Sequence, residues 1–280
     1  MNHISPNHTK PADKLIQIEL TRLTMIYRKE IDGLRALAVM LVVLYHFGFK
    51  TFSGGFVGVD VFFVISGFLI TSIIAKQVNN GTFTFKGFYV RRLKRLMPAL
   101  LAMLIVCSVG FTFIMAPTDI EKMATSVIYI LSFIGNFFFW IEYGGYFASE
   151  IKEAPFLHTW SLAVEEQFYF VWPIVLIGLL TYCKKYIVPI VIVAAVMLTL
   201  LSDFATQYTV GAAYYLLPTR AFELMIGACL GLYLLDRNVC LSKSTSSNLL
   251  LFGTSMIVGS AIYLDRNSQY PGISALIPTL

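Results

Sequence analysis

Charged residues are scarce in this 280-residue sequence. Asp, Glu, Lys and Arg together make up only 13% of it, whereas 57% of the residues are hydrophobic. The mean hydropathy is +0.73. These values lie well outside the range of soluble globular proteins. The composition therefore excludes an ordinary soluble domain and indicates a polytopic membrane protein.

Cysteine and histidine are also few, and neither is clustered. The four cysteines show no CxxC spacing, and three of the four histidines show no metal-ligand spacing (Cys107, Cys183, Cys229 and Cys240; His3, His8 and His158). We therefore expect neither a metal site nor a disulfide framework. The first 26 residues hold no apolar stretch of signal-peptide type, so the first apolar span is expected to act as the insertion signal.

Long apolar runs mark eight candidate membrane spans, near residues 34–49, 56–75, 97–116, 123–141, 168–183, 187–202, 221–235 and 248–264. The runs lack a sustained alternation of period two, which favours helices over an outer-membrane barrel. We expect an all-α fold, a transmembrane helix bundle with about eight or nine membrane segments. Residues 34–280 would form this membrane domain, after a cytoplasmic segment at 1–33.

Basic residues indicate the orientation of the bundle. They crowd the entrance to the first span and the loop after the second (Arg28, Lys29 and Arg35; Lys86, Arg91, Arg92, Lys94 and Arg95). The positive-inside rule places both groups, and the N-terminus, in the cytoplasm. Strict alternation of eight spans would put Lys184 and Lys185 outside. One assigned span is therefore expected to be re-entrant or miscounted.

The first span carries Arg35 at its entrance and His46 near its exit. Eleven residues make three helical turns plus about 20°, so both side chains lie on one face, roughly 16 Å apart along the axis. Ionisable groups at such depth are expensive and usually functional. One helix is thus predicted to hold a fixed cation and a titratable base.

Asp60 interrupts the second span about one turn from its outer end, at a depth similar to that of His46. A carboxylate that accepts the imidazole N–H would fix the tautomer of a catalytic histidine. We predict a His46–Asp60 pair. The alternative is a helix-end aspartate bonded to the hairpin backbone.

The run at 91–95 places Arg91, Arg92 and Arg95 just before an apolar run. Guanidinium groups on one helix face match the geometry of phosphate oxygens. The sequence therefore suggests a phosphate site on the cytoplasmic side. A plain topology determinant is an equally good interpretation.

Three further groups of polar residues enter spans. Glu165 and Glu166 are adjacent, so at most one can point squarely into a site, and Trp160 nearby belongs either to an interfacial aromatic belt or to a sugar-stacking platform. Arg220 and Glu223 are three residues apart and could pair with each other or contact a polar substrate. Ser66 and Gly67 are small residues that favour close helix packing.

Four of these motifs occur in an order that resembles the membrane-bound acyltransferase-3 family, which includes O-acetyltransferases of bacterial O-antigen and other surface polysaccharides. They are the Arg35-x10-His46 motif, the run Val59–Phe68, the Arg-rich loop 91–95 and the run His158–Tyr169. The last resembles the branch that often carries a C-terminal SGNH hydrolase-like domain. Family members continue through further membrane helices beyond the position of Leu280, so the domain is expected to be incomplete, without that hydrolase-like domain.

The resemblance implies transfer of an acyl group, usually acetyl, from cytoplasmic acetyl-CoA to a sugar hydroxyl across a bacterial inner membrane, with O-antigen of lipopolysaccharide as one such acceptor. His46 would be the base and Asp60 its partner, Arg35, Arg91, Arg92 and Arg95 would bind the donor, and Glu165, Glu166 and Trp160 would contact the substrates. We expect lipid, acyl-CoA and glycan as partners, and no metal or nucleic acid. A transporter or flippase, or an inactive membrane scaffold, are the rival interpretations.

Overall fold

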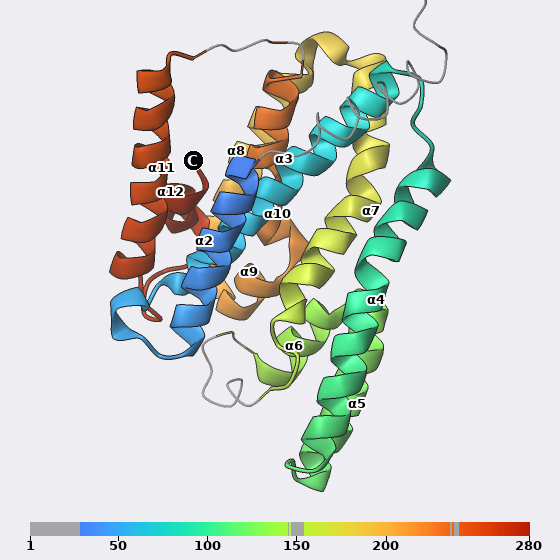
Figure 1. The fold of residues 1–280 in the computed structure, drawn as a ribbon, viewed down its shortest axis with the longest axis vertical. Helices are drawn as coiled ribbons and strands as arrows, with labels where there is room; N and C mark the ends of the chain where they lie inside the picture. The colour runs from blue at the N-terminus through green and yellow to red at the C-terminus, as the bar shows by residue number, and fades with distance from the viewer. Residues whose placement is uncertain (1–28, 145, 147–153, 236, 238–240) are drawn as a thin grey trace, which may run out of the picture.

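The computed structural model describes residues 29–144, 146, 154–235, 237 and 241–280, and within these ranges the molecule is all α, as predicted (Figure 1). The predicted cytoplasmic segment up to Arg28, with His3 and His8, lies outside the described residues, as does Cys240.

The longer helices overlap the apolar runs. They are α2 (Lys29–His46), α3 (Gly58–Asn79), α4 (Phe85–Thr112), α5 (Pro117–Leu131), α7 (Thr159–Tyr182), α8 (Ile187–Tyr208), α10 (Leu217–Tyr233) and α11 (Lys243–Tyr263). Shorter helices are α6 (Gly135–Tyr143), α9 (Val210–Tyr215) and α12 (Leu276–Thr279), together with 3-10 turns at Lys50–Phe52, Gly55–Val57, Lys184–Tyr186 and Gly272–Ala275.

Six helical segments of the described chain are long and apolar enough to cross a membrane, fewer than the eight runs predicted. They are Gly55–Asn79, Phe85–Thr112, Thr159–Tyr182, Lys184–Tyr208, Val210–Tyr233 and Lys243–Tyr263. The predicted span 34–49 overlaps α2, which ends at His46 and is a helix of 18 residues that carries Lys29, Glu30, Asp32 and Arg35 in its first two turns. These charges keep α2 out of the six.

The predicted span 123–141 is wrong as a single segment. The chain turns after Leu131, where Phe133 adopts a φ of 56°, and this conformation ends α5 before α6 begins at Gly135. A positive φ is rare for a bulky residue and is incompatible with a continuing helix. Two short helices therefore replace one span.

This break resolves the parity problem of the basic residues. In Figure 1, α4 descends from the upper end of the bundle, α5 and α6 remain in the lower half, and α7 returns to the upper end. Lys184 and Lys185, which follow α7, therefore lie at the same end as the start of α4 with its Arg-rich run. The expected miscounted span is the one at 123–141.

Helices α3 and α10 form the tightly packed centre of the bundle. A Cβ atom added to Gly67 would lie 1.9 Å from the Leu224 carbonyl oxygen, and one added to Gly227 would lie 1.9 Å from that of Val64. The two backbones thus touch at glycines on both helices, which confirms the packing interpretation of Gly67. This contact brings the first turn of α3 alongside the first turns of α10.

Polar contacts attach the neighbouring elements to this centre. The Trp172 indole of α7 donates to the Thr71 hydroxyl of α3 over 2.7 Å, and both residues are buried. At the other side, the Gly272 amide donates to the Ser202 hydroxyl of α8 over 3.1 Å. The segment that follows α11 is thereby anchored inside the bundle.

Candidate active site

A cavity of about 740 Å³ lies between α2, α3, α4 and α7, beside the N-terminal halves of α2 and α4. Its polar lining comes from Asp32, Arg35, Ser66, Arg92, Arg95, Glu165 and Tyr169, and the rest is aliphatic (Ile31, Leu69, Ile70, Ile73, Leu96 and Leu162). A volume of this size is typical of sites for small molecules and cofactors. Four separate helices bring these residues together.

The predicted donor-binding arginines have unequal positions around this cavity. Arg35 lines it and faces Asp32 of its own helix at 3.8 Å. Arg95 lines it with an exposed side chain and forms no ion pair among the described residues. Arg91 is not among the lining residues and instead donates to the Gln77 amide oxygen over 3.4 Å.

Arg92 is held by side chains of α7. Its Nε donates to Glu166 Oε1 over 2.8 Å, its Nη2 lies 3.9 Å from Glu165 Oε2, and its guanidinium lies 3.5 Å from the centre of the Tyr169 ring. The Tyr169 hydroxyl donates to Glu165 Oε2 over 3.0 Å. Of the two adjacent glutamates, Glu165 lines the cavity and Glu166 does not.

His46 lies at the opposite end of α2 from Arg35, with an exposed side chain. Its Nδ1 lies 2.8 Å from the Val42 carbonyl oxygen one turn earlier. Because a carbonyl oxygen can only accept, this contact requires the proton on Nδ1. In the neutral imidazole, Nε2 is then left with its lone pair available as a base.

His158, which directly precedes α7, lies within the electrostatic influence of His46 and was not predicted as a site residue. Its pKa is lowered, first by burial and second by the charge of His46. Both effects disfavour the protonated imidazole. The only sequence signal for this proximity was the presence of His158 in a motif of the resemblance.

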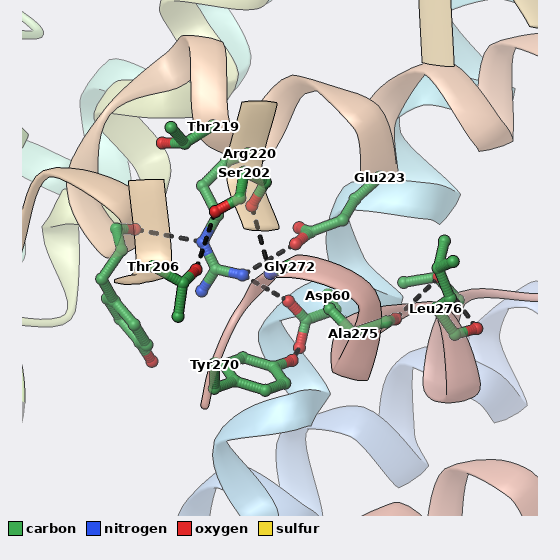
Figure 2. Close-up of polar contacts among 12 residues, drawn as sticks. Asp60, Ser202, Thr206, Thr219, Arg220, Glu223, Tyr270, Gly272, Ala275 and Leu276 are labelled. Carbon is green, nitrogen blue, oxygen red and sulfur yellow. Dashed lines mark hydrogen bonds and ion pairs between the residues drawn. The ribbon is translucent and has the colours of Figure 1, made fainter. Parts of the chain in front are cut away.

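Asp60 is fully buried and does not bond to His46. Its Oδ1 accepts from Arg220 Nη1 over 2.8 Å, and its Oδ2 accepts from the Tyr270 hydroxyl (Figure 2). The predicted His46–Asp60 hydrogen bond is therefore not formed, and the two side chains lie apart, since Asp60 is fully buried whereas His46 is exposed. The alternative of an aspartate bonded to the hairpin backbone does not describe these contacts either.

Arg220 forms the centre of this second cluster. Its Nη1 also donates to Glu223 Oε1 over 2.7 Å, which confirms the pair predicted from their spacing, and its Nε donates to the Tyr214 carbonyl over 3.0 Å. All three charged side chains are fully buried. Figure 2 shows both carboxylates on one side of the guanidinium, facing the same nitrogen, with Ser202 and Thr206 of α8 beside it.

Trp160 belongs to the aromatic shell of this cluster. It is 1% exposed, and the Arg220 guanidinium lies 5.5 Å from its ring centre and 4.5 Å from that of Tyr214. A platform for a sugar must be reachable by the sugar, and an interfacial belt must reach the lipid headgroups. Because Trp160 is buried, its ring is accessible neither to a sugar nor to the lipid headgroups.

Both clusters lie within a part of the chain that matches a known domain family. The family described as "acyltransferase domain" matches residues 28–277, which is most of the chain. The chain belongs to this family. The family inferred from the motifs is thereby confirmed.

Three similar curated proteins are named as O-acetyltransferases. Peptidoglycan O-acetyltransferase OatA of Listeria monocytogenes is 37% identical over 217 residues, which cover 75% of this chain and 34% of the relative. The putative peptidoglycan O-acetyltransferase YrhL of Bacillus subtilis is 37% identical over 213 residues, which cover 74% of this chain and 33% of the relative. A putative O-acetyltransferase of Staphylococcus aureus, SAS0844, is 40% identical over 162 residues, which cover 58% of this chain and 26% of the relative.

The chain thus spans about a third of the length of the first two of these acyltransferases. No solved structure matches it. Within the described residues, the matched domain has two distinct polar centres. One is the cavity with Arg35, Arg95 and Glu165, and the other is the buried cluster around Arg220.

Proposed function

We propose that this chain is an integral-membrane O-acetyltransferase that takes an acetyl group from acetyl-CoA at the basic end of the bundle and transfers it to a glycan hydroxyl near His46. The observation that carries the proposal is the cavity that gathers Arg35 and Arg95 at one end of α2, while His46 lies three turns further along the same helix. By the positive-inside rule, the basic end faces the cytoplasm of a bacterium.

The cavity supplies the chemistry that the donor needs. Arg35 and Arg95 are planar cations suited to phosphate oxygens. The aliphatic wall between them and Ser66 accommodates an extended arm, which must reach about 16 Å along α2 to bring a thioester from Arg35 to His46. Acetyl-CoA has this division into a phosphate-rich end and a long arm with a terminal thioester.

His46 would act as the general base. Its Nε2 takes the proton of the acceptor hydroxyl while the hydroxyl oxygen forms a bond to the thioester carbonyl carbon. The carbon–sulfur bond then breaks, the thiolate leaves and takes up a proton, and an O-acetyl ester remains on the acceptor. The bond from Nδ1 to the Val42 carbonyl keeps the imidazole in the required tautomer.

The names of the relatives favour peptidoglycan as the acceptor over the O-antigen or lipopolysaccharide that the resemblance first suggested. Two of the relatives, one from Listeria and one from Bacillus, are named for peptidoglycan. We therefore propose a hydroxyl of a cell-wall glycan.

The test is glycan-dependent release of CoA from labelled acetyl-CoA, measured in membranes that contain this chain, with peptidoglycan fragments as the acceptor. We expect release and label transfer by the unmodified chain, and a loss of at least about a hundredfold for His46→Ala, the range for removal of a general base. A control is Arg237→Gln, because Arg237 stacks on Tyr233 and does not line the cavity. Equal turnover by His46→Ala would contradict the proposal.

A further inference from the structure

Arg92 belongs to the basic run that resembles a phosphate site, yet its contacts are those of a bound and neutralised cation. Glu166 accepts from it at 2.8 Å, Glu165 lies 3.9 Å away, and the Tyr169 ring covers one face of the guanidinium at 3.5 Å. A phosphate would have to displace two carboxylates that already compensate this charge. Arg95, one turn further along α4, has no such partner among the described residues.

From this difference we infer that Arg92 is a positioning residue, and that it holds Glu165 in the cavity wall as a hydrogen-bond acceptor for an amide N–H in the arm of the donor. The inference rests on the proposed function, because it concerns the same cavity. It assigns the phosphates to Arg35 and Arg95 and the arm to Glu165.

The geometry around Glu165 supports this division. Its Oε2 accepts from the Tyr169 hydroxyl at 3.0 Å and lies 3.9 Å from Arg92 Nη2, so two side chains hold the same carboxylate oxygen. Glu165 and Ser66 are polar groups in a wall otherwise made of Leu69, Ile70 and Leu162. A carboxylate in that position would repel phosphate oxygens, whereas it accepts readily from an amide.

Replacement of Arg92 by lysine should not preserve the arrangement. The guanidinium contacts Glu166 through Nε and approaches Glu165 through Nη2 while its face covers Tyr169. A single ammonium cannot make the two forked contacts and the stacking contact together. Arg92→Lys is thus expected to resemble Arg92→Gln.

The experiment compares three probes of binding to the purified full chain in detergent micelles. The first is acetyl-CoA, the second is adenosine 3′,5′-bisphosphate, which has phosphates but no arm, and the third is acetyl-pantetheine, which has the arm but no phosphates. Each is measured with the unmodified chain and with Arg92→Gln, Glu165→Gln and Arg95→Gln.

Two opposite patterns are expected. Arg95→Gln should weaken the bisphosphate about tenfold and leave acetyl-pantetheine unchanged, because it removes a charge-assisted contact to phosphate only. Arg92→Gln and Glu165→Gln should weaken acetyl-pantetheine about tenfold and leave the bisphosphate unchanged. Unchanged bisphosphate binding also shows that these variants are folded.

The outcomes that would overturn the inference differ from those that would overturn the proposed function. If Arg92→Gln lost bisphosphate affinity as Arg95→Gln does, Arg92 would be a phosphate ligand and the inference would be wrong, while acetyl-CoA binding would still support the proposed function. If the unmodified chain bound none of the three probes, both would be wrong.

Discussion

Arg220 is one cation opposite two carboxylates, all in the interior of the bundle. Asp60 and Glu223 both accept from its Nη1, and its Nη2 has no hydrogen bond, nor does Glu223 Oε2, within the described part of the chain. Removal of one partner from a buried ion pair leaves an uncompensated charge, which is far more costly than the pair itself is favourable. The stability of the α3–α10 centre therefore depends on this one guanidinium.

We expect Arg220→Met to destabilise the folded chain by about 3–5 kcal/mol. The triple variant with Asp60→Asn and Glu223→Gln should recover a large part of this loss, because no buried charge then remains. Thermal unfolding in detergent micelles measures both, with Arg237→Met as the control for a methionine at a solvent-exposed arginine. Unfolding of Arg220→Met at the unmodified temperature would contradict the expectation.

Only local pairs in this cluster could be predicted from the sequence. Arg220 and Glu223 are three residues apart on one helix, a spacing that brings side chains together on any helix. Asp60 is 160 residues from Arg220 and 210 from Tyr270, and no periodicity links positions at such separations. The incorrect choice of His46 as the partner of Asp60 arose from their similar depth alone, since depth does not specify direction around a helix axis.

At the level of helices, apolar runs predicted the long elements and failed where a local turn decided the structure. The run at 123–141 is apolar throughout the break at Phe133, so hydropathy gives no sign that α5 ends there. The same insensitivity applies to α2, where charges at one end coexist with a continuous helix. Contacts such as the one between α3 and α10 were predictable only as a tendency of small residues to pack closely.

Gly67→Ala tests that contact. The new Cβ would lie 1.9 Å from a backbone oxygen of α10, so the helices must separate, and overpacking of this kind costs about 1–3 kcal/mol or more. The shift would also move Asp60 away from Arg220. The expected result is a lower unfolding temperature in micelles together with reduced acetyl transfer.

Gly110→Ala in α4 is the matched control. No atom lies within 4 Å of its added Cβ, so the alanine should be neutral or stabilise the helix by up to about 1 kcal/mol. Equal effects of the two substitutions would mean that helix propensity, and not the contact between α3 and α10, determines the outcome.

For the whole molecule, the division of 123–141 into α5 and α6 fixes which loops share a side of the membrane. The structure places the start of α4, which holds Lys86, and the turn Lys184–Tyr186 at one end, and the turn Lys50–Phe52 at the other. Three lysine-to-cysteine variants, made in a chain whose four natural cysteines are replaced by serine, form a matched set because all three lysines are exposed.

In intact cells, a membrane-impermeant maleimide should label Lys50→Cys and should leave Lys86→Cys and Lys185→Cys unlabelled until the cells are opened. This expectation follows from the positive-inside rule, which favours basic loops on the cytoplasmic side. If Lys185→Cys were labelled together with Lys50→Cys, the result would favour a continuous span at 123–141 and contradict the arrangement of α5 and α6.

The contacts of Asp60 also determine the order in which the protein can assemble during its synthesis. The helix α3 enters the membrane early, but Arg220 and Tyr270 follow 160 and 210 residues later. At about 5–20 residues per second, roughly 8–32 s pass between the synthesis of Asp60 and that of Arg220. Throughout this interval Asp60 lacks the two partners that bond it in the folded chain. The centre of the bundle is therefore completed late, and a ribosome that stalls before Arg220 leaves α3 without its partner.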